Sequence, residues 1–438
     1  MDTTSYNSGH GVLEFFRREA LVKKIDLYGK LNGHQSCVNA VEFNFCGDVL
    51  VSGSDDRQVI FWNWAAKTFK FVYDSGHSEN IFQVRIMPFT DDCKIVTSAA
   101  DGQVRLGEVR ENSRVETKKL GRHQGGFDLR SNSVRRLLRC SSFPEDNQQS
   151  SSSIGLNAIV IDPRSPNYFA VGGADEFARI YDIRKNQRNA SSNLGRPVNT
   201  FCPRHLVGTH SVHITGLDYS NLSELLVSYI DEFIYLFQKY MGFGPTSQSF
   251  PHKDLQYPED PQVYSGHGNA QTVKGASFFG PNDEYIMSGS DCGHIFFWKK
   301  KEAEIVRLMV GDCQIVNHLE PHPNLPVLAS CGIEKKVKLW APMSKDVRPL
   351  PHDAEKIMES NRRGREDQEQ ITFTPDVIMH VLRLHRRQPF VYTERRYNRA
   401  DIESDEEDER EAYLLGFSDG DGSSEEGTTG NSRDCNIS

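Results

Sequence analysis

The chain lacks the patterns that mark several classes of protein. Its nine cysteines are scattered without a C-x-x-C pair, and no spacing of possible ligands suits a metal. No apolar run reaches the ~18 residues of a membrane helix, and charged residues interrupt the N-terminal segment where a signal peptide needs an apolar core. We therefore expect no cofactor, no metal and no membrane span. An odd cysteine count suits the reducing nucleus or cytoplasm.

Motifs for catalysis are missing as well. The sequence shows neither carboxylates paired at a repeating position nor a nucleophile motif. We therefore do not expect an enzyme.

The net charge of −9 is concentrated at one end. Residues 401–438 hold 13 acidic residues and two arginines, a net charge of −11, so the remaining 400 residues sum to about +2. The body of the chain thus lacks the strong positive charge of a nucleic-acid-binding protein. We expect residues 401–438 to form a disordered acidic tail.

What the chain does have is a repeat. A Gly-His pair or a lone histidine precedes a closing apolar or aromatic run at a nearly constant distance. The gap is 28, 30, 27 and 31 residues in four units, from His34 to Trp62, His77 to Gly107, His210 to Phe237 and His267 to Trp298. Short apolar runs bounded by turns fill each unit, as in strands buried on both faces.

These units resemble WD repeats, which implies an all-β fold, a WD40-repeat β-propeller. With a period of about 40–45 residues, the 312 residues 31–342 hold nominally seven blades. We place the propeller at residues 21–342, after an N-terminal extension of residues 1–20, and expect residues 21–31 to form a strand that completes the last blade. In this family hydrogen bonds brace a blade. The resemblance assigns that structural network to His34, Ser52, Asp56 and Trp62 in one repeat, and to His267, Ser288 and Trp298 in another.

The third repeat departs from the pattern. Gly121-Arg122-His123 opens a unit, yet Phe127-Asp128-Leu129-Arg130, which resembles a repeat closing, follows only four residues later. We favour a deletion of about 25 residues, the inner strands of a truncated third blade. The alternative pairs His123 with Tyr181 across a long loop and makes F-D-L-R a coincidence.

Beyond the repeats, residues 343–400 form a charged helical and basic extension. Residues 353–367 indicate a helix, and residues 375–387 an amphipathic helix start. Arginines cluster at residues 383–399, where nucleic acid could bind.

Residues 169–184, F-A-V-G-G-A-D-E-F-A-R-I-Y-D-I-R, end in an aromatic-Asp-x-Arg box. That box is similar to the docking box of substrate receptors in cullin-4 RING ubiquitin ligases. Residues 12–390 resemble the family of cullin-4-associated WD-repeat factors numbered eight, its plant-like members especially. The longer matches are S-G-S-D-D-R-Q-V-I-F-W-N-W (52–64), V-K-G-A-S-F-F-G-P (273–281) and L-E-P-H-P-N-L-P-V-L-A (319–329).

The resemblance implies a non-catalytic substrate-recognition subunit whose partners are the ligase adaptor and protein substrates. Adaptor docking would fall on Arg184 with Asp182 and Tyr181, and on Arg130 with Asp128 if the third repeat is genuine. The alternative is a WD-repeat scaffold, or a protein associated with RNA or chromatin, without ligase function.

Overall fold

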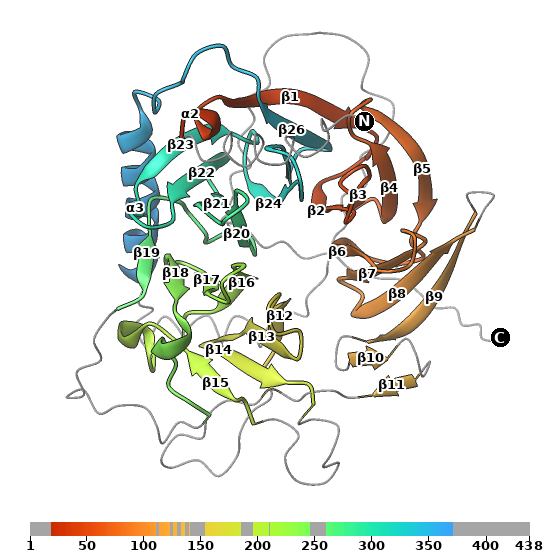
Figure 1. The fold of residues 1–438 in the computed structure, drawn as a ribbon, viewed down its shortest axis with the longest axis horizontal. Helices are drawn as coiled ribbons and strands as arrows, with labels where there is room; N and C mark the ends of the chain where they lie inside the picture. Colours follow the sequence, from red (N-terminus) through yellow and green to blue (C-terminus); the bar gives the residue numbers. More distant parts are fainter. Residues whose placement is uncertain are drawn as a thin grey trace, which may run out of the picture. The chain divides into compact units, whose positions relative to one another are not determined.

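The computed structural model describes residues 19–110, 114–122, 126–128, 133–135, 140, 154–184, 196–209, 211–245 and 260–370. The chain divides into two units, residues 1–372 and 373–438, and all described residues belong to the first. These residues are mostly strands. Six sheets of four antiparallel strands are arranged around a common axis, and in each sheet one edge strand, the inner strand, is nearest the axis (Figure 1).

We number these sheets blades 1 to 6 along the chain. Blade 1 holds β2 (Val38–Phe43), β3 (Leu50–Ser54), β4 (Gln58–Asn63) and β5 (Thr68–Asp74); blade 2 holds β6 (Ile81–Ile86), β7 (Lys94–Ala99), β8 (Gln103–Val109) and β9 (Val115–Arg122); blade 3 holds β12 (Leu156–Ile161), β13 (Tyr168–Gly173), β14 (Asp175–Asp182) and β15 (Asn199–Phe201). Blade 4 holds β16 (Ile214–Tyr219), β17 (Leu225–Tyr229), β18 (Ile234–Phe237) and β19 (Gln262–Tyr264); blade 5 holds β20 (Ala276–Phe279), β21 (Tyr285–Gly289), β22 (His294–Lys299) and β23 (Ile305–Val310).

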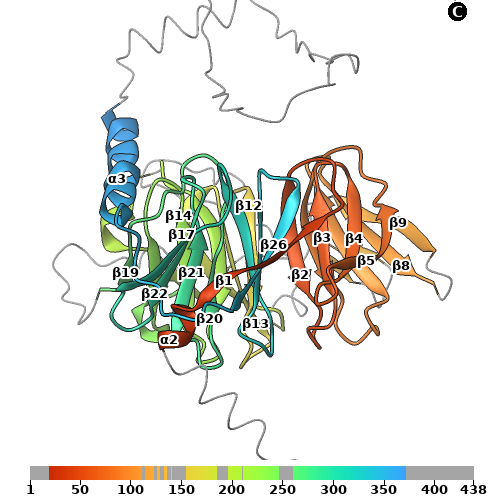
Figure 2. The ribbon, with the colours of Figure 1, turned by 90° about the horizontal axis from the view of Figure 1, so that it is seen from above.

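Blade 6 joins the two ends of the propeller. Its strands β24 (Val316–Pro321), β25 (Leu328–Gly332) and β26 (Lys336–Pro342) are completed by β1 (Ile25–Asn32), which pairs with β26 from Ile25↔Pro342 to Asn32↔Lys336. Figure 2 shows β1 crossing the ring edge to reach β26. The expectation that the segment before the first Gly-His completes the last blade is confirmed.

The nominal count of seven blades is not supported, because six blades are seen. Between blades 2 and 3 the chain forms a two-stranded sheet, β10 (Gly126–Asp128) with β11 (Ser133–Arg135), in which Asp128 is opposite Ser133. The F-D segment of F-D-L-R is thus one strand of a hairpin. Residues 123 and 130 lie outside the described residues, as do the basic cluster at 383–399 and residues 401–438.

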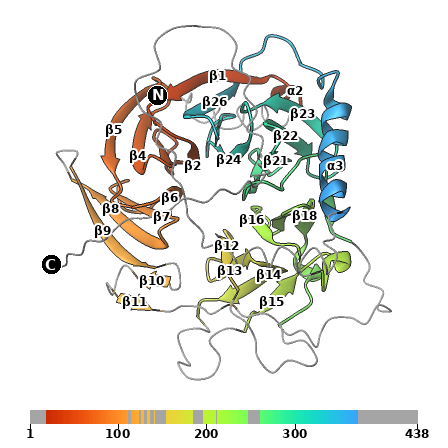
Figure 3. The same ribbon diagram turned by 180° about the vertical axis from the view of Figure 1, so that it is seen from behind.

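Among the described residues, the ring is open between blades 2 and 3. Inner strands pack between blades 6 and 1, 1 and 2, 3 and 4, 4 and 5, and 5 and 6, but no described strands of blades 2 and 3 share an extended contact. Figures 1 and 3 show the two blades separated on either side of β10 and β11. One blade-to-blade contact of a closed ring is therefore missing from the part of the chain that the structure describes.

Exposure of apolar side chains follows from this opening. Val41 on β2 is 2% exposed because it packs against blade 6. Ile159 holds the equivalent place on β12 but is 69% exposed, and Ile161 is exposed beside it. On the opposite flank, Val104 of β8 is only half-buried where Val59 of β4 is fully buried.

Two helices flank the ring. The helix α2 (Glu19–Val22) is a single turn next to β23, and α3 (Ala354–Gln370) lies along blades 4 and 5 (Figure 2). The helix expected at 353–367 is confirmed. Asn361 on α3 donates a hydrogen bond to the Gly266 carbonyl at 2.8 Å, and Arg365 donates one to the His267 carbonyl at 2.7 Å.

A candidate docking face on the propeller

Blade 1 contains a continuous hydrogen-bonded network. Nδ1 of His34 lies 2.9 Å from Asp56 Oδ2, its Nε2 lies 2.7 Å from Ser52 Oγ, and Nε1 of Trp62 donates to the same hydroxyl at 2.8 Å. The Asp56 carboxylate also accepts the backbone N–H of Gln35 and Gln58, and the hydrogen bonds from His34 and the backbone hold its pKa below the ordinary value although burial opposes them. The network joins β3, β4 and the turn between them to the segment that precedes β2, so it acts as a structural brace.

The corresponding network does not form in blade 5. Among the described residues, neither ring nitrogen of the buried His267 has a hydrogen-bond partner, while Ser288 donates to the Gly289 carbonyl and Trp298 donates to the Ser265 carbonyl. The cause is a substitution in the turn, because Cys292 stands where blade 1 has Asp56. The assignment of these three residues to a network was wrong.

The loss of that carboxylate changes the chemistry of His267. Burial, together with the positive charges of Arg365 and Lys274, lowers its pKa to about 3. The ring is packed edge-on against Trp298, with the centroids 5.7 Å apart. His267 is thus a neutral core residue.

The aromatic-Asp-x-Arg box places one buried carboxylate under one exposed guanidinium. Arg184 lies in the turn after β14, where its Nε donates to Asp182 Oδ1 at 3.0 Å and its Nη2 to Oδ2 at 2.9 Å. The Arg184 side chain is 59% exposed, whereas that of Asp182 is 4% exposed. Hydrogen bonding to Asp182 raises the pKa of Arg184, and its Cζ also lies 5.7 Å from the centroid of the Tyr168 ring. The guanidinium is thereby held in one orientation while most of the side chain stays exposed to solvent.

Tyr181 has a different place from its two neighbours. It is 1% exposed, stacks on Phe169 and has its hydroxyl 3.7 Å from Cys140 Sγ. Burial raises the pKa of the phenol. The side chain therefore anchors the end of β14 from inside and is not presented to a partner. Asp128 is on β10, and Arg130 lies outside the described residues.

Arg184 shares one face of the ring with the turns that join the first and second strands of each blade. In blade 3 the Ile183 N–H donates to the Asn167 carbonyl, and in blade 1 the Trp64 indole donates to the Gly47 carbonyl at 2.7 Å. The turn after the third strand is therefore at the same end as the turn after the first strand. We call this face the turn face.

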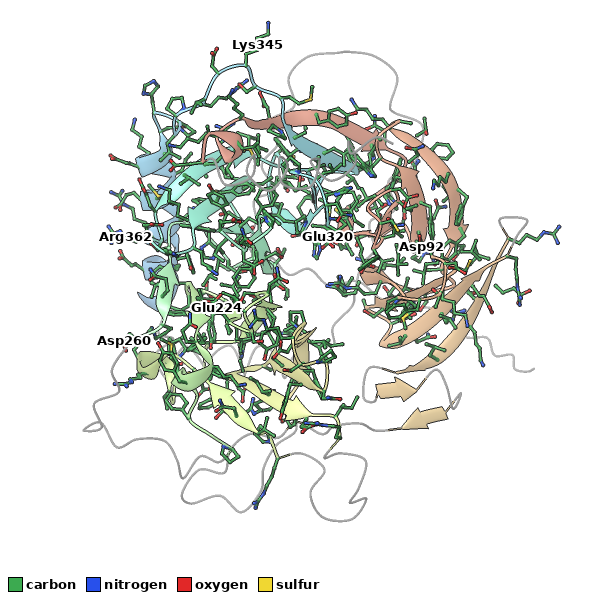
Figure 4. All side chains as sticks on the ribbon, viewed as in Figure 1. Asp92, Glu224, Asp260, Glu320, Lys345 and Arg362 are labelled. Atoms are coloured by element: carbon green, nitrogen blue, oxygen red, sulfur yellow. The ribbon has the colours of Figure 1, made fainter. Side chains whose placement is uncertain are left out.

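Hydrogen bonds between neighbouring blades link the turns of this face. Asn44 of blade 1 donates to Asp92 of blade 2 at 2.6 Å, and Ser223 of blade 4 donates to Asp162 of blade 3 at 2.8 Å. Asp92 is labelled in Figure 4, where blades 1 and 2 meet. These links hold the turns in fixed relative positions.

Blades 6 and 1 are linked through His322. Its Nδ1 accepts the N–H groups of Asn324 and Leu325, so the proton is on Nε2, which donates to the Gly47 carbonyl at 2.8 Å. Burial lowers the pKa of His322. Beside it is a cavity of about 490 Å³, lined among others by Cys46, Trp64, Lys70, His322 and Leu325.

Three apolar side chains project from the same three turns. Phe45 of blade 1 is 90% exposed, Phe89 of blade 2 is fully exposed, and Leu325 of blade 6 is 43% exposed. Phe89 also has a φ of 60°, in the left-handed region, which costs a bulky residue on the order of 1–2 kcal/mol. The sequence analysis missed these residues. The signal was present, since a phenylalanine interrupts two otherwise polar turns, N-F-C-G-D and P-F-T-D-D.

A further group of possible metal ligands lies beside blade 6. Asp312, Cys313 and Glu334 could converge on a metal, but Asp312 accepts the backbone N–H of Gln314, and Glu334 is ion-paired with Lys338 at 2.6 Å. These carboxylates already have partners within blade 6. No helix in the described ranges has the length and apolar character to cross a bilayer.

Comparison with known proteins agrees with the geometry. Residues 26–63, 259–299 and 304–341 match the family described as WD domain, G-beta repeat. The chain therefore contains WD repeats. In the structure these matches cover β1 with most of blade 1, then β19 with most of blade 5, and then blade 6 with the end of blade 5.

Several curated proteins resemble this chain. It is 29% identical over 301 residues to Protein ALTERED SEED GERMINATION 2 of Arabidopsis thaliana, covering 56% of the chain and 40% of that protein. It is 27% identical over 262 residues to human WD and tetratricopeptide repeats protein 1, covering 50% and 37%. It is 30% identical over 251 residues to mouse DDB1- and CUL4-associated factor 6, covering 51% and 28%. The chain thus spans two fifths or less of the length of these relatives.

Proposed function

We propose that this WD-repeat protein is a non-catalytic substrate receptor of a cullin-4 RING ubiquitin ligase, and that Arg184 docks the ligase adaptor, DDB1. The observation that carries the proposal is the exposed Arg184 fork held from below by the buried Asp182 carboxylate. A pre-oriented guanidinium can bind a carboxylate or carbonyl groups with little further loss of side-chain freedom. The name of mouse DDB1- and CUL4-associated factor 6 supports the choice of adaptor.

In this mechanism the propeller acts by proximity. The turn face binds the adaptor and another part of the molecule binds substrate, which raises the effective concentration of the ubiquitin-loaded enzyme near substrate lysines. The eight described cysteines are all free, which supports a reducing compartment, the nucleus or cytoplasm.

The test is the affinity of the purified chain for purified adaptor. We expect Arg184→Ala to weaken binding by about 2 kcal/mol, the loss typical of an interface hot spot, without a change in unfolding midpoint. Arg57→Ala is the matched control, because Arg57 is an exposed arginine in the turn between β3 and β4, at the other end of blade 1. Equal binding by wild type and a folded Arg184→Ala variant would refute docking through this residue. Failure of the wild-type chain to bind the adaptor would favour a scaffold without ligase function.

A further inference from the structure

The turn face carries a second feature that Arg184 does not account for. We define the apolar rim as Phe45, Phe89 and Leu325, at the tips of the first turns of blades 1, 2 and 6. We propose that the apolar rim is a second contact for the ligase adaptor, so that docking is bipartite, with Arg184 on blade 3 and the rim on the far side of the ring opening. This inference rests on the proposed function.

The first support is exposure without a structural role. Phe45 is 90% exposed and Phe89 is fully exposed. Among the described residues, neither takes part in an aromatic contact of the kind that Phe43 makes with Trp64 and His322. Single exposed apolar residues are common on proteins, but phenylalanines are enriched at the centres of interfaces.

The second support is that the rim is rigid. Asn44, next to Phe45, is held by Asp48 and by Asp92, each at 2.6 Å. On the other side, Asn324 beside Leu325 donates to the Cys46 carbonyl at 3.2 Å. Hydrogen bonds thus hold three turns from three blades together before a partner binds. This reduces the conformational entropy that is lost on binding.

The third support is strain at the most exposed ring. Phe89 has a left-handed φ of 60°, although Gly, Asn or Asp would adopt that conformation more easily. Backbone strain of this kind is concentrated at binding and catalytic sites. Phe89 neither packs on another aromatic ring nor relieves the backbone strain of its turn. A contact with another molecule explains why a phenylalanine stands there.

The chemistry of the rim specifies its occupant. The rim is apolar, adjoins a cavity of about 490 Å³, and is flanked by the exposed carboxylates of Asp48 and Asp91. The complementary patch on the adaptor is therefore apolar with a basic border. Because the rim and Arg184 share one face, a single partner surface can reach both.

The test compares adaptor affinity across variants of the full chain. We expect Phe45→Ala/Phe89→Ala to weaken the affinity for purified adaptor about tenfold or more and to leave the unfolding midpoint unchanged. Phe82→Ala is the matched control, because Phe82 is an equally bulky exposed residue near the other end of the inner strand of blade 2. Phe89→Gly separates docking from folding: glycine relaxes the positive φ, so thermal stability should rise while affinity falls.

The outcomes distinguish the two proposals. If Arg184→Ala weakens binding but the double phenylalanine variant does not, the rim proposal is overturned and the proposed function stands. If the double variant changes only self-association of the chain, the rim is a contact between copies and the proposal is again overturned. If the wild-type chain does not bind the adaptor, the proposed function falls, and the rim proposal falls with it.

Discussion

Asp182 and Arg184 form a bidentate pair in which the acid is buried and the base is exposed. In that arrangement the main effect of the carboxylate is to orient the guanidinium. A surface ion pair adds little to folding, so the two side chains can be separated experimentally by their effects on binding.

We predict that Asp182→Asn weakens adaptor binding about three- to tenfold, less than Arg184→Ala does, because the guanidinium remains but loses its fixed direction. Titration of purified adaptor into each variant measures the effect. Arg184→Lys should behave similarly to Asp182→Asn, since it keeps the charge and loses the fork. An Asp182→Asn variant that binds as tightly as wild type would show that the pair has no role in orientation.

A second prediction concerns the network of blade 1. Ser52→Ala removes the hydroxyl that both His34 and Trp62 contact, so it should lower the free energy of unfolding by about 1–3 kcal/mol. Ser288→Ala is the matched control in blade 5, because Ser288 is equally buried but contacts backbone carbonyls only. Urea titrations followed by tryptophan fluorescence measure both variants. Equal losses would contradict the difference between the blades.

A third prediction follows from His267. The unfolded chain takes up a proton near pH 6.5, whereas the folded state does so only near pH 3. Protonation therefore favours unfolding within this window, and the free energy of unfolding should fall as the pH drops from 6.5 toward 3, by up to about 1.4 kcal/mol per pH unit from this group. His267→Phe, which keeps an aromatic ring beside Trp298, should remove that part of the slope. Wild-type and variant curves that run parallel across the window would rule out a buried neutral histidine.

The open side of the ring gives a fourth prediction. Ile159→Ala should cost less than about 0.5 kcal/mol because the side chain is already exposed, while Val41→Ala at the equivalent place in blade 1 should cost about 2 kcal/mol. Denaturant titration of the two variants compares them directly. A large loss from Ile159→Ala would mean that a neighbouring blade covers β12 in solution.

The sequence predicted the parts of the fold that repeat. The distance from His34 to Trp62, with Ser52 and Asp56 between them, predicted a blade, because the same spacing recurs elsewhere in the chain. The same reasoning failed at His267, where one turn residue, Cys292, replaces the carboxylate on which the network depends. The repeat is still recognisable in the sequence after that change, although the hydrogen-bonded network of the blade is lost.

The number of blades and the docking face were harder to predict. The F-D-L-R segment resembles the end of a repeat, but a closing sequence without its inner strands forms only part of a hairpin with residues 133–135. The aromatic-Asp-x-Arg box identified the Asp182–Arg184 pair. It could not show that Tyr181 points inward, because burial depends on Cys140, a residue 41 positions away in the sequence. Phe45 and Phe89 were missed because turns far apart in the chain come together only in the ring.

The pairing of β1 with β26 has a consequence for synthesis of the protein. The ribosome releases β1 first, and its partner follows roughly 310 residues later, a delay on the order of 15–60 s at typical elongation rates. During that time β1 has an unpaired edge, and an edge of this kind attracts other nascent chains. Blade 6 is therefore the last blade that can be completed, and we expect a chain stalled before residue 336 to depend on chaperones although five of its six blades have already been made.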